Sequence, residues 1–149
     1  MPVSAIAAQA CSVARTVALI GDPWSLLLLR ELFLGSRRFD EFQRHTGAAP
    51  HLLSLRLRRL QAAGIVEARP YQQHPPRREY HLTDKGVALW PVMSALRQWG
   101  DRWQHDGGPL PVRVLHQGCG GVLRLEQRCS RCGEAVNPRQ VDLRLSRRA

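Results

Sequence analysis

The chain has 149 residues and a formal net charge of +10, which suits one domain of roughly 100 residues with an appendage and excludes two full-sized domains. So strong a positive field attracts polyanions, nucleic acid first and an anionic membrane second. The longest purely aliphatic run, at 26–29, is far below the ~20 residues of a membrane span, and no signal peptide is recognisable, so we expect a cytoplasmic protein with no membrane partner.

Helix start and stop signals divide the first part of the chain. An Asp-Pro pair at 22–23 supplies an N-cap followed by a proline at the first helical position, and Gly35 supplies a stop. Ser12 can cap a shorter helix, and a capping-box-like run at 40–43 opens a third. The sequence therefore predicts helices over residues 12–20, 23–34 and 40–45.

A fourth helix is predicted over residues 50–63, with one apolar face and one basic face. Leu53, Leu57 and Leu60 fall on a single stripe at helical spacing, which must pack inward. Together with the preceding helix and its turn at 46–48, this is the helix-turn-helix pattern, in which the second helix enters the major groove of DNA. The competing interpretation is that the basic face of this helix is only exposed to solvent and does not contact DNA. The candidate groove-facing residues are His51, Ser54, Leu55, Arg58 and Arg59.

An extended run, a tip of turn residues and a second extended run follow the fourth helix. They cover residues 65–71, 72–76 and 78–82 and predict a β-hairpin, which beside a helix-turn-helix is a wing. Arg77 and Arg78 follow a rigid Pro-Pro pair near its tip. Because arginines placed there can enter a minor groove or grip phosphates, we expect both to contact DNA.

A long apolar helix is predicted after the hairpin, beginning where Thr83 can cap it. Pro91 lies inside this pattern, so it should either kink the helix or mark its true beginning. The helix carries more apolar surface than a monomer of this size easily covers, which favours a dimer contact. The alternative is that the same residues cover the protein's own core. They are Val92, Leu96, Trp99 and Trp103.

Six short motifs follow one another between residues 11 and 103. They are Cys-x-Val at 11–13, Gly-Asp-x-Trp-Ser at 21–25, Arg-Arg-Phe-Asp-Glu-Phe-Gln at 37–43, Leu-x-x-Arg-Leu-Arg-Arg-Leu at 53–60, Pro-Pro-Arg at 75–77 and Tyr-x-Leu-Thr-x-Lys-Gly at 80–86. In order and spacing this region resembles the HxlR family of bacterial regulators. The resemblance implies an α+β, mainly helical, winged helix-turn-helix fold and a homodimer that binds operators near promoters. Some members respond to oxidants, quinones or aldehydes, which implies a small-molecule or redox effector.

Cys11 stands apart from the other three cysteines. The simpler interpretation is a small buried residue that packs near the first helix. The alternative is a redox sensor, a thiol whose pKa is lowered by a helix N-terminus and a nearby arginine. The resemblance makes this alternative worth testing, because some family members use a thiol near this position.

The last third of the chain changes composition at a Gly-Gly-Pro segment. We assign residues 11–105 to the winged helix domain, 106–112 to a linker and 113–149 to a zinc-ribbon-like, cysteine-rich extension. Two ligand-x-x-Cys-Gly units give a Cys₃His set that suits a structural, tetrahedral Zn²⁺ site, with a small hairpin at 122–125 between them. A redox dithiol and unliganded thiols are the alternatives. The candidate ligands are His116, Cys119, Cys129 and Cys132.

These features favour a sequence-specific regulator that binds double-stranded DNA as a homodimer at promoter operators. The alternative from another class is a zinc-ribbon protein-interaction module whose basic domain is only a nonspecific DNA anchor. An enzyme is the least favoured class, because the sequence contains no paired-carboxylate, Ser/His/Asp or phosphate-loop arrangement. One discrete footprint on DNA would support the regulator, and uniform coating would support the anchor.

Overall fold

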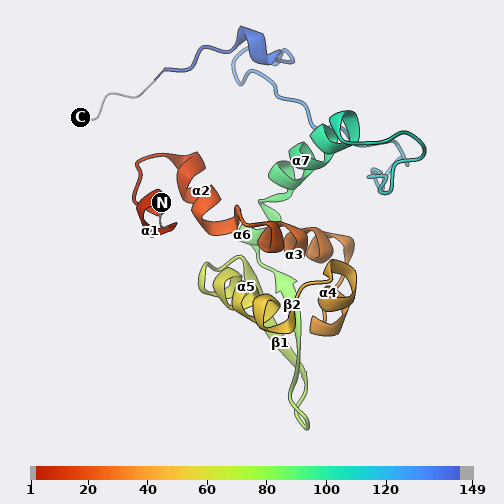
Figure 1. Ribbon diagram of the computed structural model, residues 1–149. Helices are drawn as coiled ribbons and strands as arrows, with labels where there is room; N and C mark the ends of the chain where they lie inside the picture. The colour runs from red at the N-terminus through yellow and green to blue at the C-terminus, as the bar shows by residue number, and fades with distance from the viewer. Residues whose placement is uncertain (1–2, 145–149) are drawn as a thin grey trace. The chain divides into compact units, whose positions relative to one another are not determined.

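The computed structural model describes residues 3–144, which fall into two compact units that divide between Met93 and Ser94 (Figure 1). Each unit is described by itself. The first unit contains α1 (Val3–Ala7), α2 (Ser12–Ile20), α3 (Pro23–Leu34), α4 (Phe39–Thr46), α5 (Pro50–Ala62), β1 (Val66–Gln72), β2 (Arg77–Leu82) and α6 (Asp84–Val87). The second contains η1 (Pro138–Gln140), and α7 (Trp90–Trp103) spans the division.

The helix α3 forms where the sequence predicts it, because a carboxylate caps its start and a proline occupies its first position. The Asp22 carboxylate accepts the backbone N–H of Ser25 at 3.0 Å, and Pro23 occupies the first helical position. Leu28, Leu29 and Leu32 are fully buried. This helix therefore provides the centre of the apolar core of the first unit.

The helices α4 and α5 pack on α3 and complete this core. Phe42 of α4 is fully buried, and so is the predicted leucine stripe of α5, which confirms that prediction. The buried cluster consists of Ile20, Leu28, Leu29, Leu32, Phe42, Ala48, Leu53, Leu57, Leu60, Ile65 and Val66. Since the stripe faces inward, the opposite side of α5 is left at the surface.

The strands β1 and β2 form the predicted hairpin as an antiparallel pair, with Val66 opposite Leu82 and Pro70 opposite Arg78. Figure 1 shows its tip extending beyond α4 and α5. The base of the hairpin is joined to the segment before α4, since the N–H of Tyr80 donates to the carbonyl of Arg37 at 2.8 Å. The hairpin is thus attached to the helix-turn-helix at its base and free at its tip.

The helix predicted to begin at Thr83 is divided into two. The Thr83 hydroxyl accepts the N–H of Gly86 at 3.1 Å and caps α6, which ends at Val87, and α7 begins afresh at Trp90. Pro91 has no N–H to donate to a carbonyl one turn earlier, so it stands in the first turn of a new helix. Of the two outcomes predicted for Pro91, the structure shows the true beginning of a helix.

The second unit contains two tight turns that are closed by isolated bridges, Leu115 with Val122 and Arg128 with Ala135. The small hairpin predicted at 122–125 is wrong, because Val122 pairs backward with Leu115 instead of forward. No residue between 105 and 144 is buried. None of the helices within residues 3–144 is both long and apolar enough to cross a membrane.

Candidate nucleic-acid interface

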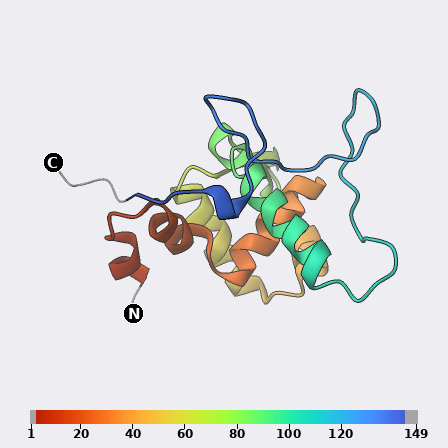
Figure 2. The same cartoon turned by 90° about the horizontal axis from the view of Figure 1, so that it is seen from above.

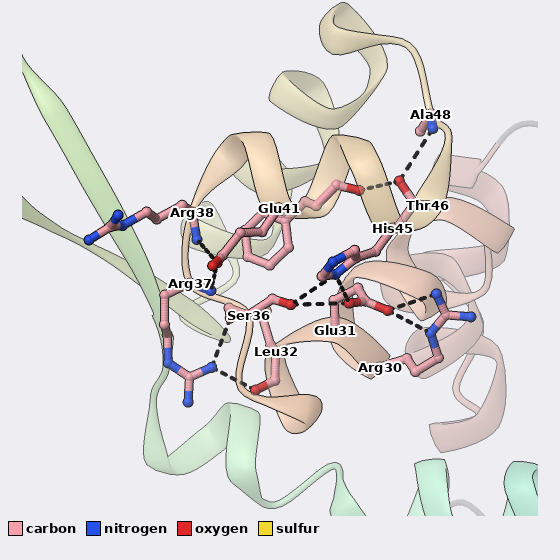
Figure 3. A network of polar contacts seen from close by, with 11 residues as sticks. Arg30, Glu31, Leu32, Ser36, Arg37, Arg38, Glu41, His45, Thr46 and Ala48 are labelled. Carbon is pink, nitrogen blue, oxygen red and sulfur yellow. Dashed lines mark hydrogen bonds and ion pairs between the residues drawn. The ribbon is translucent and has the colours of Figure 1, made fainter. Parts of the chain in front are cut away.

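The buried carboxylate of Glu31 ties α3 to α4, which is the first helix of the helix-turn-helix (Figure 3). Its side chain is only about 5% exposed and contacts Arg30 at 2.8 Å, His45 Nδ1 at 2.8 Å and the Ser36 hydroxyl at 3.1 Å. Burial raises the pKa of Glu31, but the hydrogen bonds from His45, Arg30 and Ser36 outweigh it, so the pKa lies below its ordinary value. Glu31 is therefore a charged anchor for α4.

Further polar contacts fix both ends of α4. Oε2 of Glu41 accepts the N–H groups of Arg37 and Arg38 at 2.8 and 2.9 Å, which lowers the pKa of Glu41 and caps the helix start. At the other end the Thr46 hydroxyl donates to the Phe42 carbonyl and accepts the N–H of Ala48 at 3.3 Å (Figure 3). These bonds set the turn that leads into α5.

The outer face of α5 carries four of its five predicted groove-facing residues at the surface. His51, Leu55 and Arg58 are exposed, Leu55 by 49%, and Ser54 is half-buried beside them. Because Leu53, Leu57 and Leu60 face inward, the exposed Leu55 has an apolar surface free for a partner.

Arg59 and Arg56 are used differently, as anchors of α5. The guanidinium of Arg59 donates to the Ala18 carbonyl of α2, so the groove-facing role of Arg59 stays a prediction. Nε of Arg56 lies 3.0 Å from Oδ1 of Asp22 as an ion pair without hydrogen-bond geometry. Both contacts hold the orientation of α5 relative to the helices behind it.

Arg77 and Arg78 are exposed on the wing, as the sequence predicts. Behind them lies a shallow hollow of about 570 Å³, which Arg38 also lines. The Arg38 guanidinium stacks 4.7 Å from the centre of the Tyr71 ring and donates to Glu79 at 3.3 Å, which raises the pKa of Arg38. Arg38 positions the wing, and no sequence pattern predicts this role because its partners are brought near only by the fold.

A second arginine that the sequence analysis missed is Arg44, which is exposed near the end of α4. It lines a hollow together with Gln43, Ala49 and Pro50, where α5 begins. The signal in the sequence is weak, since an arginine in the last turn of a helix is commonly explained by the helix dipole alone. Its place beside the start of α5 puts a positive charge at the edge of the candidate interface.

The predicted dimer residues on α7 are exposed. Val92 and Leu96 are 40% and 49% exposed, and Trp99 and Trp103 are 58% and 61% exposed. Such values do not fit residues that cover the protein's own core, which was the alternative interpretation. These four side chains therefore form an exposed apolar surface on α7.

The predicted zinc ligands lie in two pairs rather than one group. Nδ1 of His116 is 3.3 Å from Sγ of Cys119, and the Cys129 thiol accepts the N–H groups of Cys132 and Arg131 and bonds with the Cys132 thiol, which lowers the pKa of Cys129. Within residues 3–144 no three His, Cys, Asp or Glu side chains lie close enough to hold one metal ion. The four-ligand site therefore stays a prediction.

Cys11 precedes α2, and its side chain is exposed. The interpretation of Cys11 as a buried packing residue is therefore wrong, because the chain enters α2 at the surface of the first unit. An exposed thiol is accessible to oxidants, as a sensor requires.

Comparisons with known proteins agree with this geometry. Residues 19–107 match the HxlR-like helix-turn-helix family. An HTH-type transcriptional regulator of Mycobacterium tuberculosis is 40% identical over 130 residues, which cover 87% of this chain and 82% of that protein. The crystal structure of PA1607, assigned as a transcription factor, has a TM-score of 0.83 and 37% identity over 97% of this chain and 99% of that chain. The redox regulator HypR in its reduced form has a TM-score of 0.58 and 37% identity over 61% of this chain and 91% of that chain.

The family match spans more than half of the chain and includes α3, the helix-turn-helix and the wing. The similarity to PA1607 extends beyond it into the extension, since it covers 97% of this chain. Sequence, fold and relatives agree on a winged helix-turn-helix protein. The chain belongs to the HxlR-like helix-turn-helix family and is a transcriptional regulator of the helix-turn-helix type.

Proposed function

We propose that this regulator binds double-stranded DNA in a sequence-specific manner, as a homodimer at operator sites. The observation that carries the proposal is the outer face of α5, an exposed strip on a helix held in place by Arg56 and Arg59. A rigid helix with short and long polar side chains on its free side suits the major groove, where donors, acceptors and thymine methyl groups are read.

Arg58 is the residue best placed to read sequence. Within residues 3–144 no carboxylate pairs with its guanidinium, which is exposed. A bidentate contact to guanine is worth about 1–3 kcal/mol of discrimination, and the exposed Leu55 offers an apolar contact for a thymine methyl group. His51 and Ser54 add hydrogen-bonding groups nearer the start of α5.

The wing and the end of α4 supply contacts that hold the protein on the duplex without reading bases. Arg77 and Arg78 extend from the hairpin, and Arg44 lies beside the start of α5. Contacts from arginines to phosphates fix register and orientation, and arginines in a narrow minor groove respond to its shape. These three residues therefore contribute affinity.

The homodimer is supported by the exposed apolar residues of α7. Two copies that pack through this helix bury tryptophan and leucine surface that is open in one chain. A two-fold axis then presents two α5 helices to successive major grooves, about 34–36 Å apart or a multiple of this spacing. The expected operator is a pseudo-palindrome.

Footprinting on DNA upstream of the chain's own gene tests the proposal. We expect one discrete protected site, and Arg58→Ala should lose about 1–3 kcal/mol of discrimination at one base pair of each half-site. Arg15→Ala removes the same charge from α2, outside α5 and the wing, and should leave the base preference unchanged. Uniform coating would instead favour the nonspecific anchor with a zinc-ribbon interaction module.

We also propose that a redox effector acts at Cys11. The exposed thiol of Cys11 lies directly before α2, and the Ala18 carbonyl of α2 accepts a hydrogen bond from Arg59 of α5. The neighbour HypR is a redox regulator. Mild peroxide should weaken operator binding by the wild-type chain and leave Cys11→Ser unaffected. Loss of affinity in that variant would move the sensor to another thiol, with Cys129 and Cys132 as the next candidates.

A further inference from the structure

The second unit builds the same turn twice. In the first turn the carbonyl of His116 accepts the N–H of Gly120 at 2.8 Å, and the N–H of His116 donates to Gly121 at 2.8 Å. In the second, Cys129 makes the equivalent bonds, accepting from Gly133 at 2.9 Å and donating to Glu134 at 3.0 Å. We call them the His116 turn (residues 114–123) and the Cys129 turn (residues 127–136).

The match extends to the ends of both turns. Val114 accepts the N–H of Leu123, and Gln127 accepts the N–H of Val136, in both cases at 2.8 Å. Gly120 and Gly133 have φ values of 69° and 75°, a conformation that glycine adopts without strain. The ligand-x-x-Cys-Gly pattern is the main feature that the two sequences share, so this pattern selects the common backbone.

Each turn places two metal-binding side chains next to one another. The imidazole of His116 touches the Cys119 sulfur at 3.3 Å, and the thiols of Cys129 and Cys132 are hydrogen-bonded. Two nitrogen or sulfur donors from each turn amount to half of a tetrahedral zinc site.

The segment that joins the two turns is hydrogen-bonded to α7. Nε2 of Gln98 donates to the Leu125 carbonyl at 3.3 Å, and the N–H of Leu125 donates back to the Gln98 amide oxygen. Figures 1 and 2 show the turns as two separate loops of the second unit. Neither turn is therefore completed by the other within residues 3–144 of one chain.

We propose that a second copy of the chain completes each half-site, so that His116 and Cys119 of one chain bind Zn²⁺ together with Cys129 and Cys132 of the other. A two-fold dimer then contains two equivalent sites and one zinc ion per chain. Four protein ligands close the coordination shell, so the zinc is structural, and each thiol releases its proton to solvent on binding. This inference rests on the proposed homodimer.

The exposed apolar side chains of the extension support a shared site. Leu115, Val122, Leu123 and Leu125 are 38–57% exposed, and no residue from 105 to 144 is buried. A segment of this size without a core needs a metal or a partner to hold one conformation. A zinc site that is shared between two subunits supplies both the metal and the partner.

Complementation between two variants tests the proposal in the full-length protein. One variant combines His116→Ala with Cys119→Ser, the other combines Cys129→Ser with Cys132→Ser, and differently tagged chains are co-expressed to isolate the heterodimer. Elemental analysis should find one zinc per wild-type chain, none in either variant homodimer, and one per heterodimer, because one intact site re-forms between the chains. Cys11→Ser removes a thiol outside the turns and should retain all of its zinc.

Other outcomes overturn the shared site. A heterodimer without zinc means that both turns of one chain bind the metal together, and half of the zinc in each variant homodimer means that like turns pair across the dimer. Wild-type protein without zinc, with Cys129 and Cys132 joined as a disulfide, means a redox dithiol. Sedimentation and operator footprinting on the same samples separate these failures from a failure of the dimer or of DNA binding.

Discussion

The helix-turn-helix unit and the extension are stabilised in different ways. In the first unit α3, α4 and α5 surround leucines that are fully buried, and the side chains of Asp22 and Thr83 cap the starts of α3 and α6. Between residues 105 and 144 the chain buries no side chain and relies on two turns closed by backbone hydrogen bonds. The first unit folds on its hydrophobic core, and we expect the extension, which has none, to depend on a bound metal or partner.

Removal of metal should have the largest effect and should act on one region alone. With a chelator present, the amides that close the His116 and Cys129 turns should lose their protection from hydrogen exchange completely, because the proposed zinc holds a segment without a core in one conformation. Amides of α3 should exchange as before. Hydrogen exchange resolved by segment measures both. Protection of the turns that survives chelation would contradict the metal dependence of the extension.

A core substitution should produce the opposite pattern. Leu57→Ala removes a fully buried side chain and should lower the free energy of unfolding of the first unit by about 2–5 kcal/mol in urea titration. Leu123→Ala, at a position 40% exposed in the extension, should change it by no more than about 0.5 kcal/mol. Equal losses of unfolding free energy in the two variants would contradict this prediction, because they would mean that the two regions share a core.

The bounds of α3 and the leucine stripe of α5 were predictable because their signals are local. The Asp22 cap and the helical spacing of the leucines act within a few residues of each other. The break between α6 and α7 was predictable only as one of two outcomes, since a proline permits both a kink and a new start. The helix α1 was not predicted at all.

Contacts between distant residues explain most of what was missed at the site. Arg59 and Ala18, or Arg38 and Glu79, are 41 residues apart, and no sequence pattern identifies such partners. The exposed side of α5 followed from its stripe, but the anchoring of Arg59 did not. The ligand spacing likewise predicted each metal-binding pair, and it carried no information on whether the pairs meet in one chain.

Loss of the buried Glu31 charge should have an intermediate effect on the free energy of unfolding, and this effect should depend on pH. Its pKa is lowered on folding, so its charge stabilises the protein above the unfolded-state pKa, near 4.5, and this contribution is lost as the pH falls through the folded-state pKa. Glu31→Gln should cost about 1–3 kcal/mol at neutral pH and flatten this acid dependence. Glu67→Gln breaks the exposed ion pair with Arg69 and should change the free energy of unfolding little in urea titrations at pH 7 and pH 4.

The wing should show the smallest effect on stability and a clear effect on function. Arg77 and Arg78 are exposed at the tip of a hairpin, so replacing both with alanine should leave the free energy of unfolding within about 0.5 kcal/mol of wild type. If both contact phosphates, the slope of log K against log salt should become shallower by about 1.8, because two fewer counterions are released.

The matched control for the wing is the double variant Arg113→Ala and Arg124→Ala, which removes the same charge from the extension. Operator binding at several salt concentrations should give this control the wild-type slope. An equal change in both double variants would mean that net charge alone sets the salt dependence. The wing would then be a structural hairpin, and affinity for the backbone would have to come from α5 and Arg44.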